Sequence, residues 1–100
     1  MNYITLNEIK QQCRIDSTFT ADDDLLTDIG NGAEDFVQSH LNTQLDDITA
    51  ENGGELPVAI KRAILMLVSY MYDNDGSGHN EDVPQAFWIL LNPYKTYSIA

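Results

Sequence analysis

Apolar side chains recur at steps of three and four residues between positions 25 and 41, and this period predicts an amphipathic helix. Its apolar stripe is made of Leu25, Leu26, Ile29, Ala33, Phe36, Val37, His40 and Leu41. Three aspartates, residues 22–24, precede the stripe, where carboxylates suit a helix N-terminus, and we expect Thr20 to be the N-cap. Gly30 and Gly32 each cost about 1 kcal/mol relative to Ala inside a helix. They indicate close approach of a neighbouring helix or subunit, or else a mild kink.

A second stretch, from Val58 to Tyr72, is apolar on nearly every side. Pro57 suits the first turn of a helix, where its missing amide has no partner to lose. Lys61 and Arg62 are the only charged residues of the stretch. A helix without a broad polar face must be covered on several sides. We therefore predict that residues 57–72, approximately, form the central helix of the fold and that another subunit covers part of it.

Shorter signals predict two further helices. Thr5 and Glu8 form a capping box that starts a first helix, whose inner side carries Leu6, Ile9 and Cys13. Pro84 opens a short last helix, which Asn92-Pro93 ends. Residues 42–55 read as a loop because they contain Asn52-Gly53-Gly54.

No alternation typical of strands is convincing, and residues 94–100 are expected to form an irregular or short-strand tail. One hundred residues are ordinary for a single domain. The sequence as a whole (1–100) thus predicts one all-α domain, a small bundle of about four helices.

Charge narrows the classes of function. Five Lys and Arg stand against sixteen Asp and Glu, so the formal net charge is -11. Binding to DNA relies on cations that displace counterions from the phosphates, so direct non-specific DNA binding is disfavoured. The acidity is interpreted first as a source of solubility; an acidic face for a basic partner and a negative channel wall are the alternatives.

The remaining composition indicates a soluble, cytoplasmic-type protein. Cys13 is the only cysteine, so no internal disulfide forms, and its helical spacing predicts a buried core thiol. The first residues lack the basic and apolar regions of a signal peptide. No segment approaches the ~20 apolar residues that span a bilayer, so no membrane partner is expected.

One motif suggests a metal ion. The run Asp73-Asn74-Asp75-Gly76-Ser77-Gly78 resembles the start of an EF-hand calcium loop. A variant site would take as ligands Asp73, Asp75, Ser77 and Glu81. The bidentate carboxylate that ends such a loop is replaced here by Pro84, and so we interpret the segment as an acidic linker between helices and expect no metal.

No arrangement of residues indicates catalysis. The sequence contains no nucleophile elbow, phosphate loop or zinc cluster. The pair Glu34-Asp35 is interpreted as part of a solvated helix face, and His40 as a packed or boundary residue. We therefore expect no enzyme activity and no cofactor.

The order of the segments resembles a known family, the head–tail connector (adaptor) proteins of long-tailed double-stranded DNA phages and prophages, which are often labelled DNA-packaging proteins. The first matching segments are Ile4–Lys10 with Cys13–Asp16, and Asp23–Leu26 with Ala33–Val37. The longest is Leu56–Val68, which is followed by Tyr70–Asn74. The last is Val83-Pro84 with Leu90–Lys95. The sequence departs from the family at Asp75, where Arg is frequent, and in the tail after Lys95.

The resemblance implies a virion protein that is assembled in the cytoplasm of the bacterial host. It implies a ring, typically twelve-fold, beneath the portal protein that extends the DNA channel and receives a tail-completion protein. DNA would pass through without sequence-specific binding. We expect the contacts with other subunits and partners to include Asp28, Asp35, Asp73, Asp75, Trp88, Tyr94 and Tyr97. Two alternatives remain: an acidic interaction module, such as a DNA mimic or an inhibitor of a basic protein, and a calcium-responsive helical protein.

Overall fold

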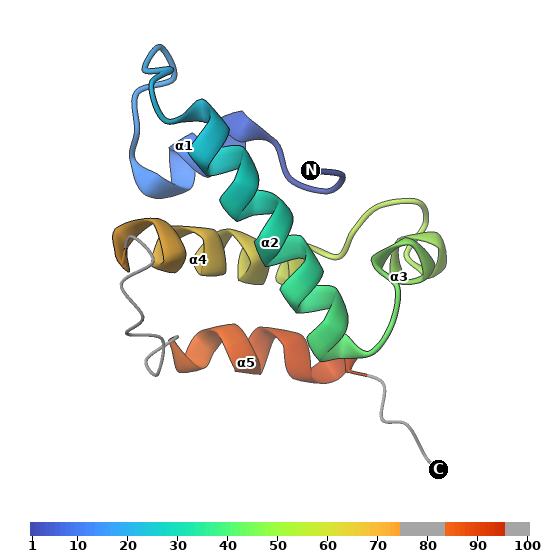
Figure 1. Cartoon of the computed structure of the whole chain (residues 1–100). Helices are drawn as coiled ribbons and strands as arrows, with labels where there is room; N and C mark the ends of the chain where they lie inside the picture. Colours follow the sequence, from blue (N-terminus) through green and yellow to red (C-terminus); the bar gives the residue numbers. More distant parts are fainter. Residues whose placement is uncertain (75–83, 96–100) are drawn as a thin grey trace.

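Five α-helices and one short 3-10 helix make up the part of the chain that the computed structural model describes, residues 1–74 and 84–95 (Figure 1). They are α1 (Leu6–Cys13), α2 (Asp23–Leu41), α3 (Leu45–Glu51), α4 (Val58–Asn74), α5 (Gln85–Leu91) and η1 (Asn92–Tyr94). No strand occurs within these ranges. The prediction of an all-α bundle is confirmed, while most of the expected tail lies outside the described residues.

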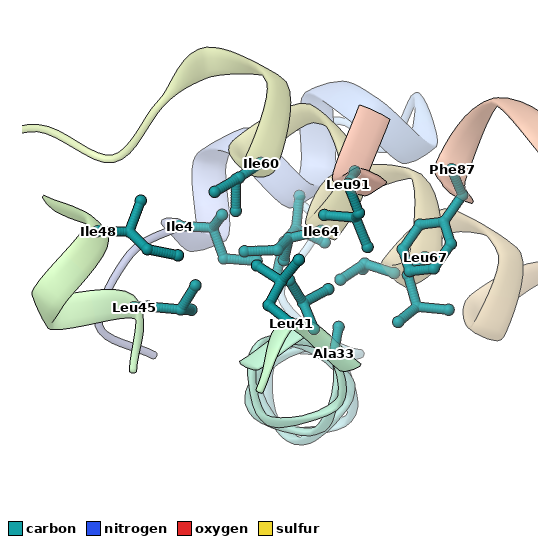
Figure 2. Close-up of a cluster of buried hydrophobic side chains, with 14 of the residues drawn as sticks. Ile4, Ala33, Leu41, Leu45, Ile48, Ile60, Ile64, Leu67, Phe87 and Leu91 are labelled. Carbon is teal, nitrogen blue, oxygen red and sulfur yellow. The ribbon is translucent and has the colours of Figure 1, made fainter. Parts of the chain in front are cut away.

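The apolar helix α4 lies at the centre of the bundle, as its sequence predicted. Helices α1, α2 and α5 all pack against it, and Figure 1 shows α2 crossing it with α1 and α5 on either side. The α4 side chains that face these neighbours are fully or almost fully buried, namely Ile60, Ala63, Ile64, Leu67 and Val68. They meet apolar residues of every other helix in a single core (Figure 2). Each large side chain buried there contributes about 1.5–3 kcal/mol.

The interpretation of residues 42–55 as a loop is wrong, because α3 lies within that range. The Asn52-Gly53-Gly54 signal does mark a turn, in which both glycines have positive φ. This turn signal outweighed that of the two apolar residues before it, Leu45 and Ile48. They are one helical turn apart and are buried in the core. One amphipathic turn that packs on an existing core is enough to form a short helix.

The capping box at α1 is confirmed, whereas the N-cap expected for α2 is wrong. The Glu8 amide donates to Thr5 Oγ1, and the Thr5 amide donates to a Glu8 carboxylate oxygen. Helix α2 begins at Asp23, so Asp22 and not Thr20 is its N-cap. The Asp22 side chain makes no capping bond; one of its carboxylate oxygens accepts a hydrogen bond from the hydroxyl of Tyr72 at 2.8 Å. This contact ties the start of α2 to α4.

A buried lysine holds the connection between α1 and α2. Lys10 is 4% exposed, and its ammonium donates to the Phe19 carbonyl at 2.8 Å and to that of Ser17 at 3.4 Å. It also lies 2.8 Å from a carboxylate oxygen of Asp23. A buried cation requires such compensation, and here it fixes the path of the residues that lead into α2.

The expectation that Glu34 lies on a solvated face is also wrong. Glu34 is 6% exposed, and its carboxylate accepts hydrogen bonds from the backbone amides of Asn2, Tyr3 and Ile4 at 2.9–3.0 Å. These three amides belong to an N-terminal segment outside the helices, which has no other backbone partner for them. The neighbouring Asp35 is exposed, as predicted.

Candidate assembly surfaces

The apolar stripe predicted along α2 divides into two faces. The buried face consists of Leu26, Gly30, Ala33, Val37 and Leu41. The other residues, together with Gly32, fall within an arc of about 80° at 100° per residue, and form what we call the outer stripe: Leu25, Ile29, Gly32, Phe36 and His40. Leu25 and Phe36 are 44% and 46% exposed. The outer stripe therefore leaves apolar surface, chiefly that of Leu25 and Phe36, that the protein's own core does not cover.

An aromatic cluster joins the C-terminal end of the outer stripe to α5. The ring of Trp88 lies 4.9 Å from that of His40 and 6.2 Å from that of Phe36, measured between centroids. Phe87, which is fully buried, contacts the Trp88 ring edge-on at 4.7 Å. Burial, and then the charge of Lys95, lowers the pKa of His40 below its ordinary value. The interpretation of His40 as a packed or boundary residue is confirmed.

An acidic row runs beside the outer stripe. Asp24, Asp28, Asn31 and Asp35 recur at helical spacing along α2, and all four side chains are exposed. Asp28 and Asp35 are two turns apart, which places them about 10 Å from each other along the helix axis. Apolar side chains flanked by charges of one sign are typical of a surface that meets a partner of the opposite charge.

A groove of about 400 Å³ lies on the side of the molecule where α4 meets α1, and we call it the α4 groove. It is lined by Gln12, Val58, Lys61, Arg62, Leu65 and Met66. Three of its lining residues are apolar, and its two charged residues are cations. Val58 is 75% exposed, which makes it the most exposed of the large apolar residues that the structure describes.

The two cations of the α4 groove differ in their surroundings. Lys61 lies 2.6 Å from a carboxylate oxygen of Glu8. Burial raises the pKa of that carboxyl, but the hydrogen bonds from Lys61 and from Thr5 outweigh it, so that the pKa of Glu8 is lowered. Arg62 is exposed, and within residues 1–74 and 84–95 its guanidinium has no ion-pair partner.

Only some of the residues predicted to make contacts are brought together. Asp28 and Asp35 share the acidic row, and Trp88 lies beside the outer stripe. Asp73 is exposed at the other end of α4, while the half-buried Tyr94 lines a separate hollow of about 410 Å³ near α3. Asp75 and Tyr97 lie outside the described residues, as do Ser77 and Glu81 of the suggested calcium site.

The described residues were searched for metal-binding groups and for a reactive thiol. Among them, no three His, Cys, Asp or Glu side chains are grouped closely enough to hold a metal ion. Cys13 is half-buried and not fully buried as predicted, and its burial raises the thiol pKa; the hydrogen bond with Ser69 lowers it, and the charge of Asp73 raises it further. A thiol that holds its proton is a poor nucleophile. Within the same residues, no helix combines the length and apolar character that crossing a bilayer requires.

Sequence reasoning missed the exposure of Phe36 and Leu25 and the role of Arg62 as an unpaired cation. A signal for the first was available, since the stripe on α2 is wider than the face of one helix that packs on a core. No comparable signal existed for the α4 groove, because its lining comes from two helices and depends on how they pack.

Comparison with known protein families identifies a family for this chain. A protein-family model described as phage gp6-like head-tail connector protein matches residues 3–87. No match was found among curated proteins or among solved structures.

Proposed function

Because the chain belongs to the phage gp6-like head-tail connector family, we propose that it forms a ring with copies of itself beneath the phage portal protein. The ring extends the DNA channel and presents a platform to a tail-completion protein. Members of this family are structural phage proteins and are not known as enzymes. Association with portal and tail proteins follows from membership; the ring, its order and its assembly in the bacterial cytoplasm are parts of the proposal.

The observation that carries the ring is the outer stripe. Leu25 and Phe36 leave nearly half of their surface in water although they belong to a helix whose other face is fully packed. Large apolar side chains that gather on one exposed face mark interaction sites more often than isolated ones do. Removing this face from water upon assembly would stabilise the ring by the same effect that stabilises the core.

The charge of the chain supports passage of DNA without binding. A net charge of -11 opposes contact with phosphates, and all five cationic side chains lie in the described residues. Lys10 and Lys61 are engaged in ion pairs. With so few cations available, a channel wall made from this chain would release few counterions and hold DNA weakly.

The test is assembly with and without the portal protein of the same phage. Native mass spectrometry and negative-stain electron microscopy of the purified protein, and of the protein co-expressed with that portal, should reveal closed rings in at least one of the two samples. A chain that stays monomeric in both samples contradicts the proposal. If that monomer instead binds a cationic protein in competition with DNA, the acidic interaction module is the better description.

A further inference from the structure

We propose that the outer stripe of one copy packs into the α4 groove of the next copy, with the acidic row facing Arg62. The inference rests on the proposed ring and specifies the contact that builds it. The two surfaces are complementary, since one is an apolar ridge with carboxylates beside it and the other is a hollow lined by three apolar side chains and two cations.

The position of the two surfaces makes the contact head-to-tail. The buried face of α2 packs on α4, and α1 and α5 occupy further sides of α4, so the groove lies on the side of α4 that these packed faces leave open. A chain that carries a ridge and a separate hollow joins neighbours in one direction, and such contacts close into rings when the rotation permits. Pairing two outer stripes would instead set one acidic row against another, which like charges disfavour.

Charge selects the partner of the acidic row. Asp28 and Asp35 are exposed, and Arg62 is the groove cation that has no ion-pair partner among the described residues. Lys61 is already 2.6 Å from Glu8. Arginine also suits this role because its planar guanidinium binds carboxylates through two hydrogen bonds.

The shape of the outer stripe fits a helix as its partner. A Cβ placed on Gly32 would meet no atom within 4 Å, so the backbone of α2 is open to an incoming side chain at this point of the stripe, between Ile29 and Phe36. Gly30 differs, since its missing side chain leaves room for Met1 and Ile9 of the same chain. Of the two glycines expected to allow close approach, one thus serves the chain's own N-terminal segment, and the other is open to the protruding Val58 of a neighbour.

Cross-linking between single cysteines tests the contact directly. In a Cys13→Ser background, Gly32→Cys marks the outer stripe and Val58→Cys marks the groove, and neither change removes a charge. One variant is isotopically labelled, the two are mixed, and a short bismaleimide joins cysteines that meet. We expect products that join position 32 to position 58 to exceed both kinds of same-site product. Ala50→Cys, an exposed position on α3, replaces Gly32→Cys in the control mixture.

Charge exchange provides a second, independent readout. Arg62→Glu should lower the 32–58 yield about tenfold, as should Asp28→Arg with Asp35→Arg, and all three changes in one chain should restore it. Asp47→Arg makes the same kind of substitution, of a carboxylate by a cation, once on α3 and should leave the yield unaltered. The contact is wrong if the 32–58 yield stays at the level of the Ala50 control, for the protein alone and with portal present. Rings that form without this cross-link would overturn the contact and leave the proposed function standing.

Discussion

Glu34 provides the sharpest test of the fold, because one side chain holds an entire segment in place. Its carboxylate accepts three backbone amides, from Asn2, Tyr3 and Ile4, and is itself buried within α2. In Glu34→Ala these amides lose their acceptor. The segment they belong to carries Ile4, a core residue that is 3% exposed.

The expected loss follows from the exposure of each amide. The amide of Ile4 is buried, so leaving it unpaired costs about 1–3 kcal/mol. Asn2 is exposed and Tyr3 is half-buried, so water replaces part of what their amides lose, and they add about 1 kcal/mol between them. We therefore expect Glu34→Ala to lower the free energy of unfolding by about 2–4 kcal/mol. For a domain of this size that corresponds to a fall in Tm of at least about 8 °C.

Urea unfolding followed by far-ultraviolet circular dichroism measures this difference. Asp35→Ala is the matched control, because it removes an exposed carboxylate from the next position of the same helix and should change stability by less than about 0.5 kcal/mol. Faster hydrogen exchange at the amides of residues 2–4 should accompany the loss in Glu34→Ala. If Glu34→Ala is as stable as Asp35→Ala, the carboxylate does not hold the segment and the reasoning is refuted.

Three further predictions follow from single contacts. Gly32→Ala should raise the free energy of unfolding by about 0.5–1 kcal/mol, since a Cβ meets no atom there. Gly30→Ala should give no such gain, because its Cβ would lie 3.1 Å from Ile9 Cδ1 and against Met1. Equal gains in the two variants would contradict this difference. The pKa of Glu8 is lowered from 4.5 in the folded state, so the ionised carboxylate stabilises the fold above pH 4.5, and this contribution disappears as the pH falls through the lowered pKa. Glu8→Gln should thus be less stable than the parent protein at neutral pH and approach its stability in acid. Urea titrations at several pH values would reveal this. Burial favours the neutral form of His40 and lowers its pKa below 6.5. The contribution of this residue to the free energy of unfolding should therefore be fully present above pH 6.5 and decline as the pH falls from there through the pKa of the folded state. An imidazole NMR titration with its midpoint at or above 6.5 would exclude this.

The helices that pattern alone determines were predicted well. The central helix, the capping box and the short last helix were all found, because apolar period, caps and proline act within a few residues of each other. The family was identified from the order of segments along the chain, and the family model that matches residues 3–87 confirms it. Helix α3 was missed because a glycine-rich turn signal outweighed two apolar residues whose burial depends on the rest of the core.

The surfaces were predicted less well, since burial is decided by packing between distant segments. Glu34 lies at helical spacing from Gly30 and Val37 on the buried face of α2, whereas Asp35 faces water. That Glu34 captures three amides, however, depends on where the N-terminal segment runs. Likewise, Phe36 and Val37 are equally apolar, yet only Val37 reaches the core. The choice of Asp28 and Asp35 as contact residues stays a prediction, which the cross-linking experiment tests.

The molecule is thin, with principal extents of 44 × 31 × 19 Å. A helix with its side chains is about 10 Å across, so the shortest dimension holds two packed helices with one layer of core side chains between them. In the proposed ring the outer stripe of α2 meets the α4 groove of the next copy, so this thin direction would run from one neighbour to the other. Enlarging a side chain in that core, for instance at Ala63, would push the two contact faces apart, so the spacing between neighbouring copies would be expected to increase.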